Sequence, residues 1–354
     1  MHMDYRALLD DFITTLMREN GSDLHLSVGR VPTIRASGQL LSLVGKEPFS
    51  RETILGILSV VLGEEKLRKF VETQEIDFAY DYKDEARLRG NAFFQKGSVS
   101  ISLRLIPKVK SLSELQLPDT LASFARKKQG LFLIVGPVGQ GKSTTMASLV
   151  NMINEERNEH IITVEDPIEY VFVPKNSLID QREVGIDTHD FPSALKSVFR
   201  QDANVIMIGE MRSADTMSAA VTAAETGHLV FSTLHTNNAL QTIDRIIDGF
   251  PSGQQDQVKT QLANSLIGIF SQRLIPRVSG GLVPAFELLV CTPAVANLIR
   301  EGRTHEIEVV IETGQDQGMI DMNRCLIDLV RKGEISMENA YLYSLNPKAL
   351  ERLF

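Results

Sequence analysis

One segment near the middle of the chain, 136–143, constrains the fold more than any other feature. Its sequence GPVGQGKS fits the pattern G-x-x-x-x-G-K-[ST], and it stands between the apolar run 131–135 and a helical run that starts at Thr144. A strand, a glycine-rich turn and a helix in this order form the phosphate-binding loop of nucleotide-binding α/β proteins. The glycines let backbone N–H groups curl around phosphates, and the helix N-terminus adds a partial positive charge.

We expect this loop to bind ATP together with Mg²⁺. Lys142 would reach the β- and γ-phosphates, and the Ser143 hydroxyl would bind the metal ion. The loop residues predicted to contact the nucleotide are Gly136, Pro137, Val138, Gly139, Gln140, Gly141, Lys142, Ser143 and Thr144.

Two acidic groups follow apolar, strand-like runs further along the chain. VIMIGE ends in Glu210, and IITVEDPIE contains Glu165, Asp166 and Glu169. Acidic residues after strands are often helix caps. A phosphate loop, however, needs a carboxylate on a neighbouring strand to hold a metal ion or to position water. The two groups together therefore favour catalysis, with Glu210 as a predicted metal ligand beside Ser143.

His228 and His235 bracket the apolar run 229–234. Their odd spacing would place them on opposite faces of a regular strand, so they are not expected to bind one metal ion together. Isolated histidines are mostly structural. One of these two could sense the γ-phosphate at the C-terminal end of the strand, where open α/β sheets bind ligands.

The pattern divides the chain into two domains. Residues 1–107 mix strand-like runs with a few helices, two of them in 51–73, and predict an α+β domain. The polar, proline-bounded segment 108–118 is the expected linker. In 119–354, near-continuous apolar strands alternate with helices, which predicts a largely parallel sheet buried on both faces. Residues 253–354 are expected to be mostly helical.

Composition narrows the possible partners and the compartment. The net charge is −8, whereas a nucleic-acid binder usually shows a basic footprint. No apolar run approaches the ~18 residues of a membrane helix, and the first residues show no secretory signal. We therefore expect a cytoplasmic protein without direct membrane insertion. The two cysteines, Cys291 and Cys325, are too few for a four-cysteine zinc module.

Four boxes in the sequence resemble those of a known family. GPVGQGKSTT, ITVEDPIEY, VIMIGEMRS and AETGHLVFSTLHTN resemble, in this order, the Walker A, Asp, Walker B and His boxes of the type II/IV secretion ATPases. The resemblance extends over nearly the whole chain and is nearest to the pilus retraction branch, PilT and its paralogue PilU. It implies a RecA-like P-loop NTPase core with a PAS-like N-terminal domain.

The resemblance also implies a function and a set of partners. The protein would be a cytoplasmic homohexameric motor that hydrolyses ATP to retract type IV pili in twitching motility. It would lie beneath the inner membrane, bound to the platform protein of the pilus machinery, and a PilT/PilU paralogue is a further possible partner. Each nucleotide would sit between the core of one subunit and the N-terminal domain of the same or an adjacent subunit.

Residue roles follow from the matched boxes. Glu169 matches the family's general base, and Glu210 matches the Walker B glutamate. Arg89 and Arg104 match arginines that close on the phosphates, and strand alternation independently places Arg87 and Arg89 on one face. The predicted catalytic residues are Lys142, Glu169, Glu210 and His235, and the predicted nucleotide contacts outside the loop are Glu165, Asp166, His228, Arg89 and Arg104.

Three other functions stay open at this point: a pilus extension or type II secretion motor, a RecA-like nucleic-acid translocase, and a non-hydrolysing nucleotide-binding regulator. The extension branch carries a four-cysteine segment and often extra N-terminal domains, and this sequence shows neither. The acidic balance disfavours the translocase.

The sequence departs from the family pattern at four positions. AVANLIRE (294–301) resembles the retraction motif AIRNLIRE, with Ala296 in place of an arginine. We expect this segment to form a short amphipathic helix with Leu298 buried. Gln140, Asn204 and Gly97 stand where serine, aspartate and arginine are usual.

Overall fold

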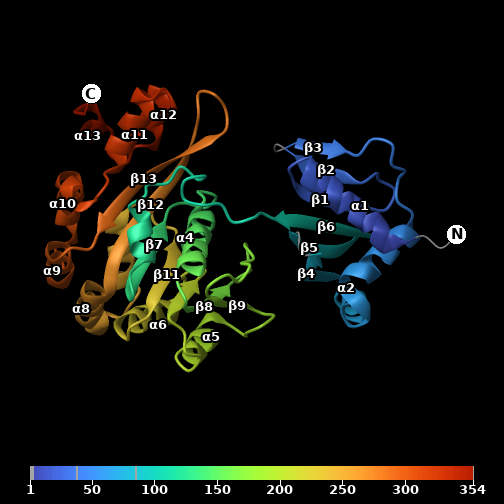
Figure 1. The fold of residues 1–354 in the computed structure, drawn as a ribbon, viewed down its shortest axis with the longest axis horizontal. Helices are drawn as coiled ribbons and strands as arrows, with labels where there is room; N and C mark the ends of the chain where they lie inside the picture. The colour runs from blue at the N-terminus through green and yellow to red at the C-terminus, as the bar shows by residue number, and fades with distance from the viewer. Residues whose placement is uncertain (1–3, 37–38, 84–85, 354) are drawn as a thin grey trace. The chain divides into compact units, whose positions relative to one another are not determined.

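The computed structural model describes residues 4–36, 39–83 and 86–353. The chain forms two compact units, Met1–Lys108 and Val109–Phe354 (Figure 1). Each unit has a hydrophobic core of its own. In the described parts of the chain, no helix combines the length and the apolar character needed to cross a membrane.

The first unit is a six-stranded antiparallel sheet in the order β3-β2-β1-β6-β5-β4, with two helices packed against it. Alternation sets the buried face, because Leu24 and Leu26 of β1 enter the core while Asp23 and His25 point the other way. The elements are α1 Tyr5–Arg18, β1 Gly21–Ser27, β2 Thr33–Ala36, β3 Gln39–Ser42, α2 Arg51–Thr73, β4 Glu75–Tyr82, β5 Ala86–Gln95 and β6 Ser98–Ile106.

The two helices predicted in 51–73 are both present, joined across a break. Helix α2 is interrupted at Gly63, whose φ of 67° lies in the left-handed region that favours glycine. Strand β3 was missed by the sequence reasoning. All four of its residues are exposed, so it carries no alternation of buried and exposed side chains.

The second unit is a seven-stranded sheet in the order β13-β12-β7-β11-β10-β8-β9. All neighbouring strands are parallel except the β12–β13 pair. The strands are β7 Gly130–Val135, β8 His160–Glu165, β9 Leu178–Glu183, β10 Val205–Ile208, β11 Leu229–Leu234, β12 Leu266–Pro276 and β13 Leu282–Val290. The helices of eight or more residues are α4 Lys142–Glu156, α5 Phe191–Val198, α6 Ala214–Glu225, α7 Ala239–Asp248, α8 Gln255–Ser265, α9 Pro293–Glu301 and α11 Met322–Arg331, and the shorter ones are α3 Leu121–Ala125, α10 Ile307–Thr313, α12 Met337–Tyr343 and α13 Pro347–Glu351.

Helices cover both faces of this sheet. Every residue of the central strands β7, β10 and β11 is buried. Leu131 and Leu133 of β7 pack with residues of α5 to α10, whereas Phe132 and Ile134 pack with residues of α3 and α4. A sheet with two covered faces requires near-continuous apolar strands, and this is the pattern from which the α/β class was predicted.

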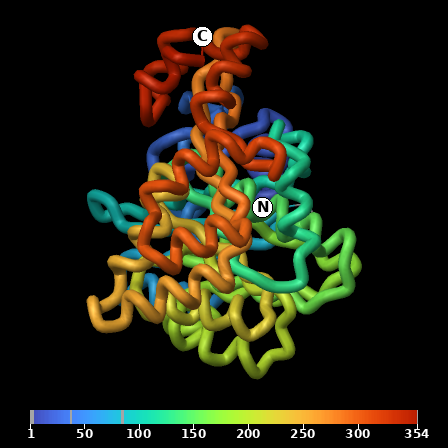
Figure 2. Tube along the Cα trace, turned by 90° about the vertical axis from the view of Figure 1, so that its left-hand side faces the viewer, coloured from blue at the N-terminus to red at the C-terminus, as the bar shows by residue number. Residues whose placement is uncertain are grey.

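Most of the described residues in 253–354 are helical, as expected, but the sequence reasoning missed two strands in this range. Strands β12 and β13 form a long antiparallel hairpin within that range, and β9 was missed at the opposite edge of the sheet. Short apolar runs fit a buried helix as well as a strand, so periodicity alone did not separate them. Figure 2 shows the orange hairpin leading to the red C-terminal segment, where Ile275 and Val283 join helices α11 to α13 in a separate apolar cluster.

Candidate nucleotide site

The segment 136–141 joins β7 to the N-terminus of α4, as predicted. Gly136, Gly139 and Gly141 have φ values of 146°, 77° and 80°, which favour glycine. At Gly136 a Cβ atom would lie only 2.4 Å from the carbonyl oxygen of Gln272 on β12. The glycines therefore serve both the turn itself and the close approach of the loop to β12. The exposed tip of the loop is Val138 and Gly139.

Lys142 is buried inside the loop. Its Nζ donates to the carbonyl oxygens of Gly136 at 2.7 Å and Pro137 at 2.8 Å. Burial lowers the pKa of this lysine, and the negative charges of Glu210 and Glu169 oppose that effect. The ammonium is therefore held at the centre of the loop, close to two of the carboxylates predicted to act in catalysis.

His235 connects Lys142 to Glu210. Its Nδ1 lies 3.1 Å from the Lys142 Nζ, and its Nε2 lies 3.1 Å from a Glu210 carboxylate oxygen. Glu210 also accepts a hydrogen bond of 2.9 Å from the Nε of Arg212. Because β10 and β11 run parallel to β7 in register, residues that follow all three strands meet at one edge of the sheet.

Glu165, at the end of β8, is a buried carboxyl group. Burial raises its pKa to about 7, against hydrogen bonds from the Thr163 hydroxyl, the Gln181 amide and the backbone N–H of Glu169. Glu169 itself is exposed, and so is Asp166. Glu165 is therefore part of the support of the 166–169 turn, while the carboxylate of Glu169 remains accessible to solvent.

Two hydroxyl groups follow Lys142 in the first turn of α4. Thr144 exchanges a hydrogen bond of 2.7 Å with the Tyr170 hydroxyl, next to Glu169. Ser143 is half-buried. Hard oxygen ligands suit Mg²⁺, and the Ser143 hydroxyl and the Glu210 carboxylate both belong to this edge of the sheet.

The other predicted residues lie elsewhere. His228 precedes β11, about 20 Å along the strand from His235, and its Nδ1 lies 2.9 Å from the carbonyl oxygen of Ala223 at the end of α6. Within the same chain it is thus at the far end of β11 from the phosphate loop. Arg89 and Arg104 belong to the first unit, where they are direct cross-strand partners. Their roles at the nucleotide stay predictions.

Arg104 is anchored by Asp23 on β1. Its Nε donates to Asp23 Oδ1 at 2.8 Å, although the arginine side chain is 72% exposed. Burial raises the pKa of Asp23, but hydrogen bonds from Ser22 and Arg104 outweigh this effect and hold it below its usual value. Asp23 therefore stays ionised and orients the guanidinium group.

One of the departures from the family pattern, Asn204, has a structural explanation here. The Asn204 side chain accepts from the backbone N–H of His160 at 2.9 Å and so ties β8 to the segment before β10. Ala296 and Leu298 lie on α9, the predicted helix. The expectation for Leu298 was wrong, because it is only partly buried while Val295 and Ile299 are completely buried.

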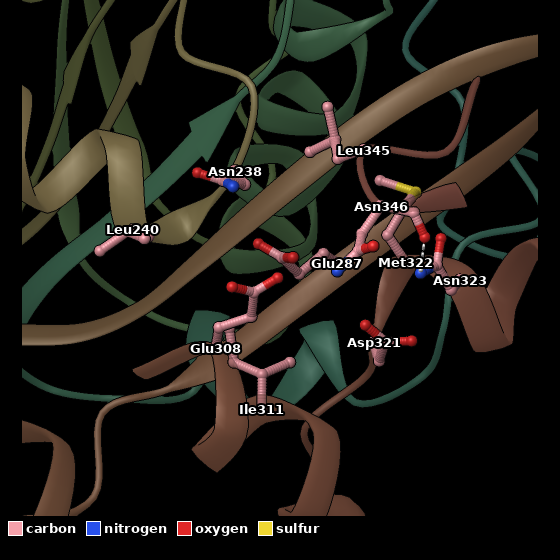
Figure 3. Close-up of a pocket in the computed structure, with 10 residues that line it drawn as sticks. All are labelled: Asn238, Leu240, Glu287, Glu308, Ile311, Asp321, Met322, Asn323, Leu345 and Asn346. Carbon is pink, nitrogen blue, oxygen red and sulfur yellow. Dashed lines mark hydrogen bonds between the residues drawn. The ribbon is translucent and has the colours of Figure 1, made fainter. Parts of the chain in front are cut away.

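A second polar feature of this unit is a cavity of about 30 Å³ beside the C-terminal helices. Figure 3 shows the carboxyl groups of Glu287 and Glu308 side by side, with Asn238 and Asp321 further along the wall. Asn238 and Asp321 cap the N-termini of α7 and α11, and Glu287 accepts from the first backbone N–H of α7 at 2.8 Å. Asn238, Asp321 and Glu287 are thus engaged with helix N-termini, which attract negative charge.

The loop between β7 and α4, its buried lysine and the carboxylates at the ends of β8 and β10 define a P-loop nucleotide-binding protein of the α/β class. The profile of the type II/IV secretion system protein family matches residues 64–342, and the chain belongs to this family.

The relatives share most of their length with this chain. The type IV pilus retraction ATPase PilT of Pseudomonas aeruginosa is 41% identical over 91% of this chain and 94% of its own length. The type IV pilus ATPase PilU of the same organism is 39% identical, over 97% and 89%. The crystal structure of the pilus retraction motor PilT with bound ADP matches with a TM-score of 0.90 and 42% identity, over 97% of this chain and 98% of that one. These findings confirm the family and the fold class predicted from the four boxes.

Proposed function

We propose that this protein is a motor ATPase that uses ATP hydrolysis to retract type IV pili. The observation that carries the proposal is the phosphate-binding loop with its buried lysine, in a chain whose full length resembles a pilus retraction motor that binds ADP. The similarity to PilT and PilU, both pilus ATPases by name, supports the same assignment.

The loop binds the phosphates. Its backbone N–H groups and the N-terminus of α4 offer partial positive charge, and Lys142 brings a full charge that neutralises the β- and γ-phosphates. Phosphate oxygens would replace the carbonyl oxygens of Gly136 and Pro137 as partners of the ammonium group. His235 would sense the γ-phosphate, and its contacts with both Lys142 and Glu210 support this role.

Glu169 acts as the general base that takes a proton from the attacking water. Its carboxylate is exposed at the edge where the strands end, and its charge acts on Lys142. On either side of Glu169, the Tyr170 hydroxyl bonds to the Thr144 hydroxyl, and Glu165 accepts from the backbone N–H of Glu169. Glu210 holds the metal ion or positions the water.

Mg²⁺ would be held by Ser143 and Glu210. Among the residues that the structure describes, no three His, Cys, Asp or Glu side chains are grouped to hold a metal ion. This fits a cation that takes one or two protein oxygens and completes its shell with phosphate and water, as Mg²⁺ does. When bound, the ion neutralises charge that develops on the phosphates.

The active form in this proposal is a homohexamer, with Arg89 and Arg104 completing the site of the same or an adjacent subunit. The support is that the arginines and the phosphate loop belong to different compact units. Mixing Lys142→Ala subunits with Arg104→Ala subunits tests completion by a neighbour. Recovered ATPase activity is expected if Arg104 completes the site of an adjacent subunit, and no recovery if it acts within its own subunit. A fully active monomer by light scattering would refute the ring.

The partners are the platform protein of the pilus machinery and a PilT/PilU paralogue, so the motor is cytoplasmic and reaches the inner membrane through that platform. A pilus extension or secretion motor is the alternative. Imaging pili in a deletion strain separates the two motors, because loss of retraction leaves excess pili whereas loss of extension leaves bald cells. The ATPase activity of the purified chain, with and without single-stranded DNA, tests the regulator and the translocase.

A further inference from the structure

Strand β12 extends past the end of its neighbour β7. The last pair between the two strands is Val135 with Ser271, whereas β12 continues to Pro276 alongside β13. Beyond Ser271, the edge of β12 that faced β7 faces the phosphate loop instead. The carbonyl of Gln272 is the group that a Cβ atom at Gly136 would strike.

Three hydrogen bonds join this edge to the loop and to α4. The Gln272 amide donates from Nε2 to the carbonyl oxygen of Gln140 at 2.9 Å. The Thr145 hydroxyl donates to Gln272 Oε1 at 2.6 Å. The backbone N–H of Leu274 donates to the side-chain Oε1 of Gln140 at 2.7 Å.

The geometry fixes the orientation of each amide. Thr145 and Gln272 are both almost completely buried, at 1% and 3% exposure. Because the Gln140 carbonyl oxygen can only accept, the Gln272 amide nitrogen must point at it, and this turns Oε1 toward the Thr145 hydroxyl. The side-chain oxygen of Gln140 in turn accepts the hydrogen bond that the Leu274 N–H would otherwise donate to a neighbouring strand. A side chain shorter than glutamine would leave that N–H without this acceptor.

We propose that Gln140 and Gln272 are positioning residues that hold the phosphate loop in the conformation that binds nucleotide. The peptide group between Gln140 and Gly141 immediately precedes Lys142 and the N-terminus of α4, so fixing its carbonyl fixes the direction of the loop N–H groups. Neither residue is required to touch the reacting atoms. The proposal rests on the assignment of ATP to this loop.

The loss of this support has a defined kinetic signature. Without this support, the loop adopts the conformation that binds nucleotide for only part of the time. The apparent affinity for ATP is then reduced by that fraction. Removing one uncharged hydrogen bond corresponds to a change of about 3- to 10-fold. We therefore expect Gln140→Met, which keeps the size but removes the acceptor, to raise the KM for ATP by that factor with little change in kcat.

Hydrogen exchange reports on the contact itself. In Gln140→Met, a peptide spanning 271–276 should exchange faster than in the wild-type protein, because Leu274 loses its partner. Gln140→Glu keeps an acceptor oxygen at the same place and should restore the protection. Gln257→Met makes the same chemical change at an exposed position of α8 and should alter neither exchange nor KM.

A second variant tests the other glutamine. Gln272→Glu still accepts from Thr145 but turns a carboxylate oxygen toward the Gln140 carbonyl, so its KM should rise by at least as much. An unchanged KM with unchanged exchange in Gln140→Met overturns the proposal, and so does a fall in kcat alone. Normal turnover in Lys142→Ala would instead remove the nucleotide assignment of the loop, which separates the two failures.

Discussion

Replacing Glu287 by Gln should stabilise the protein at alkaline pH. Burial raises the pKa of Glu287 from 4.5 to about 7, with the charges of Asp321 and Glu308 adding to the rise and that of Arg273 opposing it. Between these pH values the unfolded chain has lost its proton while the folded chain keeps it, so stability falls as the pH rises. The glutamine keeps an oxygen to accept from Ala239 but carries no charge.

The size of the effect follows from the shift. Each pKa unit corresponds to about 1.4 kcal/mol, so the wild-type carboxyl group costs about 3 kcal/mol at pH 8 and less than about 1 kcal/mol at pH 5. The assay is urea unfolding of the full chain by circular dichroism at both pH values. The relevant transition is the one that ADP shifts, since a ligand stabilises the unit that binds it. A stability difference that is equal at the two pH values would refute the reasoning.

The remaining predictions concern the nucleotide site and α9. Lys142→Ala should abolish hydrolysis and weaken nucleotide binding, measured by turnover and titration with a fluorescent ATP analogue, because the charge on the phosphates loses its partner; normal turnover would contradict the loop assignment. Glu169→Gln should bind ATP but turn over ~10²–10⁴-fold more slowly, and Glu210→Gln should also be impaired; a wild-type rate in the first with a dead second would reverse their roles. Arg300→Ala removes an exposed side chain whose hydrogen bond of 3.2 Å to Asn264 adds little to stability. It should therefore form rings and hydrolyse ATP yet fail to restore twitching in a deletion strain, whereas full restoration would make the 294–301 motif purely structural.

Sequence reasoning located the residues whose positions are set locally. Lys142, Glu165, Glu210 and His235 each follow a recognisable apolar strand, and parallel strands deliver such residues to one edge of a sheet. Strand alternation likewise placed Arg89 on the face that it occupies. The contacts that could not be predicted from the sequence are those made by packing between segments far apart in the chain. Gln272 contacts a residue 132 positions away, and nothing near it in the sequence signals that contact.

The same limit explains the errors in the fold. Strand β9 is an edge strand with no fully buried residue, and β12 is apolar enough to fit a buried helix, so neither carried the period of a half-buried strand. Leu298 was expected to be buried as an apolar residue of a short amphipathic helix. An amphipathic pattern shows that one face of a helix is apolar, but not which residues of that face pack most deeply. In α9 the residues that are completely buried against the neighbouring helices are Val295 and Ile299.

Strand β12 is the element where these distant contacts concentrate. Ser271 and Arg273 bond to Asn237, the last residue of the His box, while Gln272 and Leu274 bond to the phosphate loop. The next residue along the strand enters the apolar cluster of the C-terminal helices. The phosphate loop and the end of the His box are thus both hydrogen-bonded to β12, the strand that packs against helices α11 to α13. A displacement of the C-terminal helices relative to the nucleotide must therefore either move both loops together with β12 or break these hydrogen bonds.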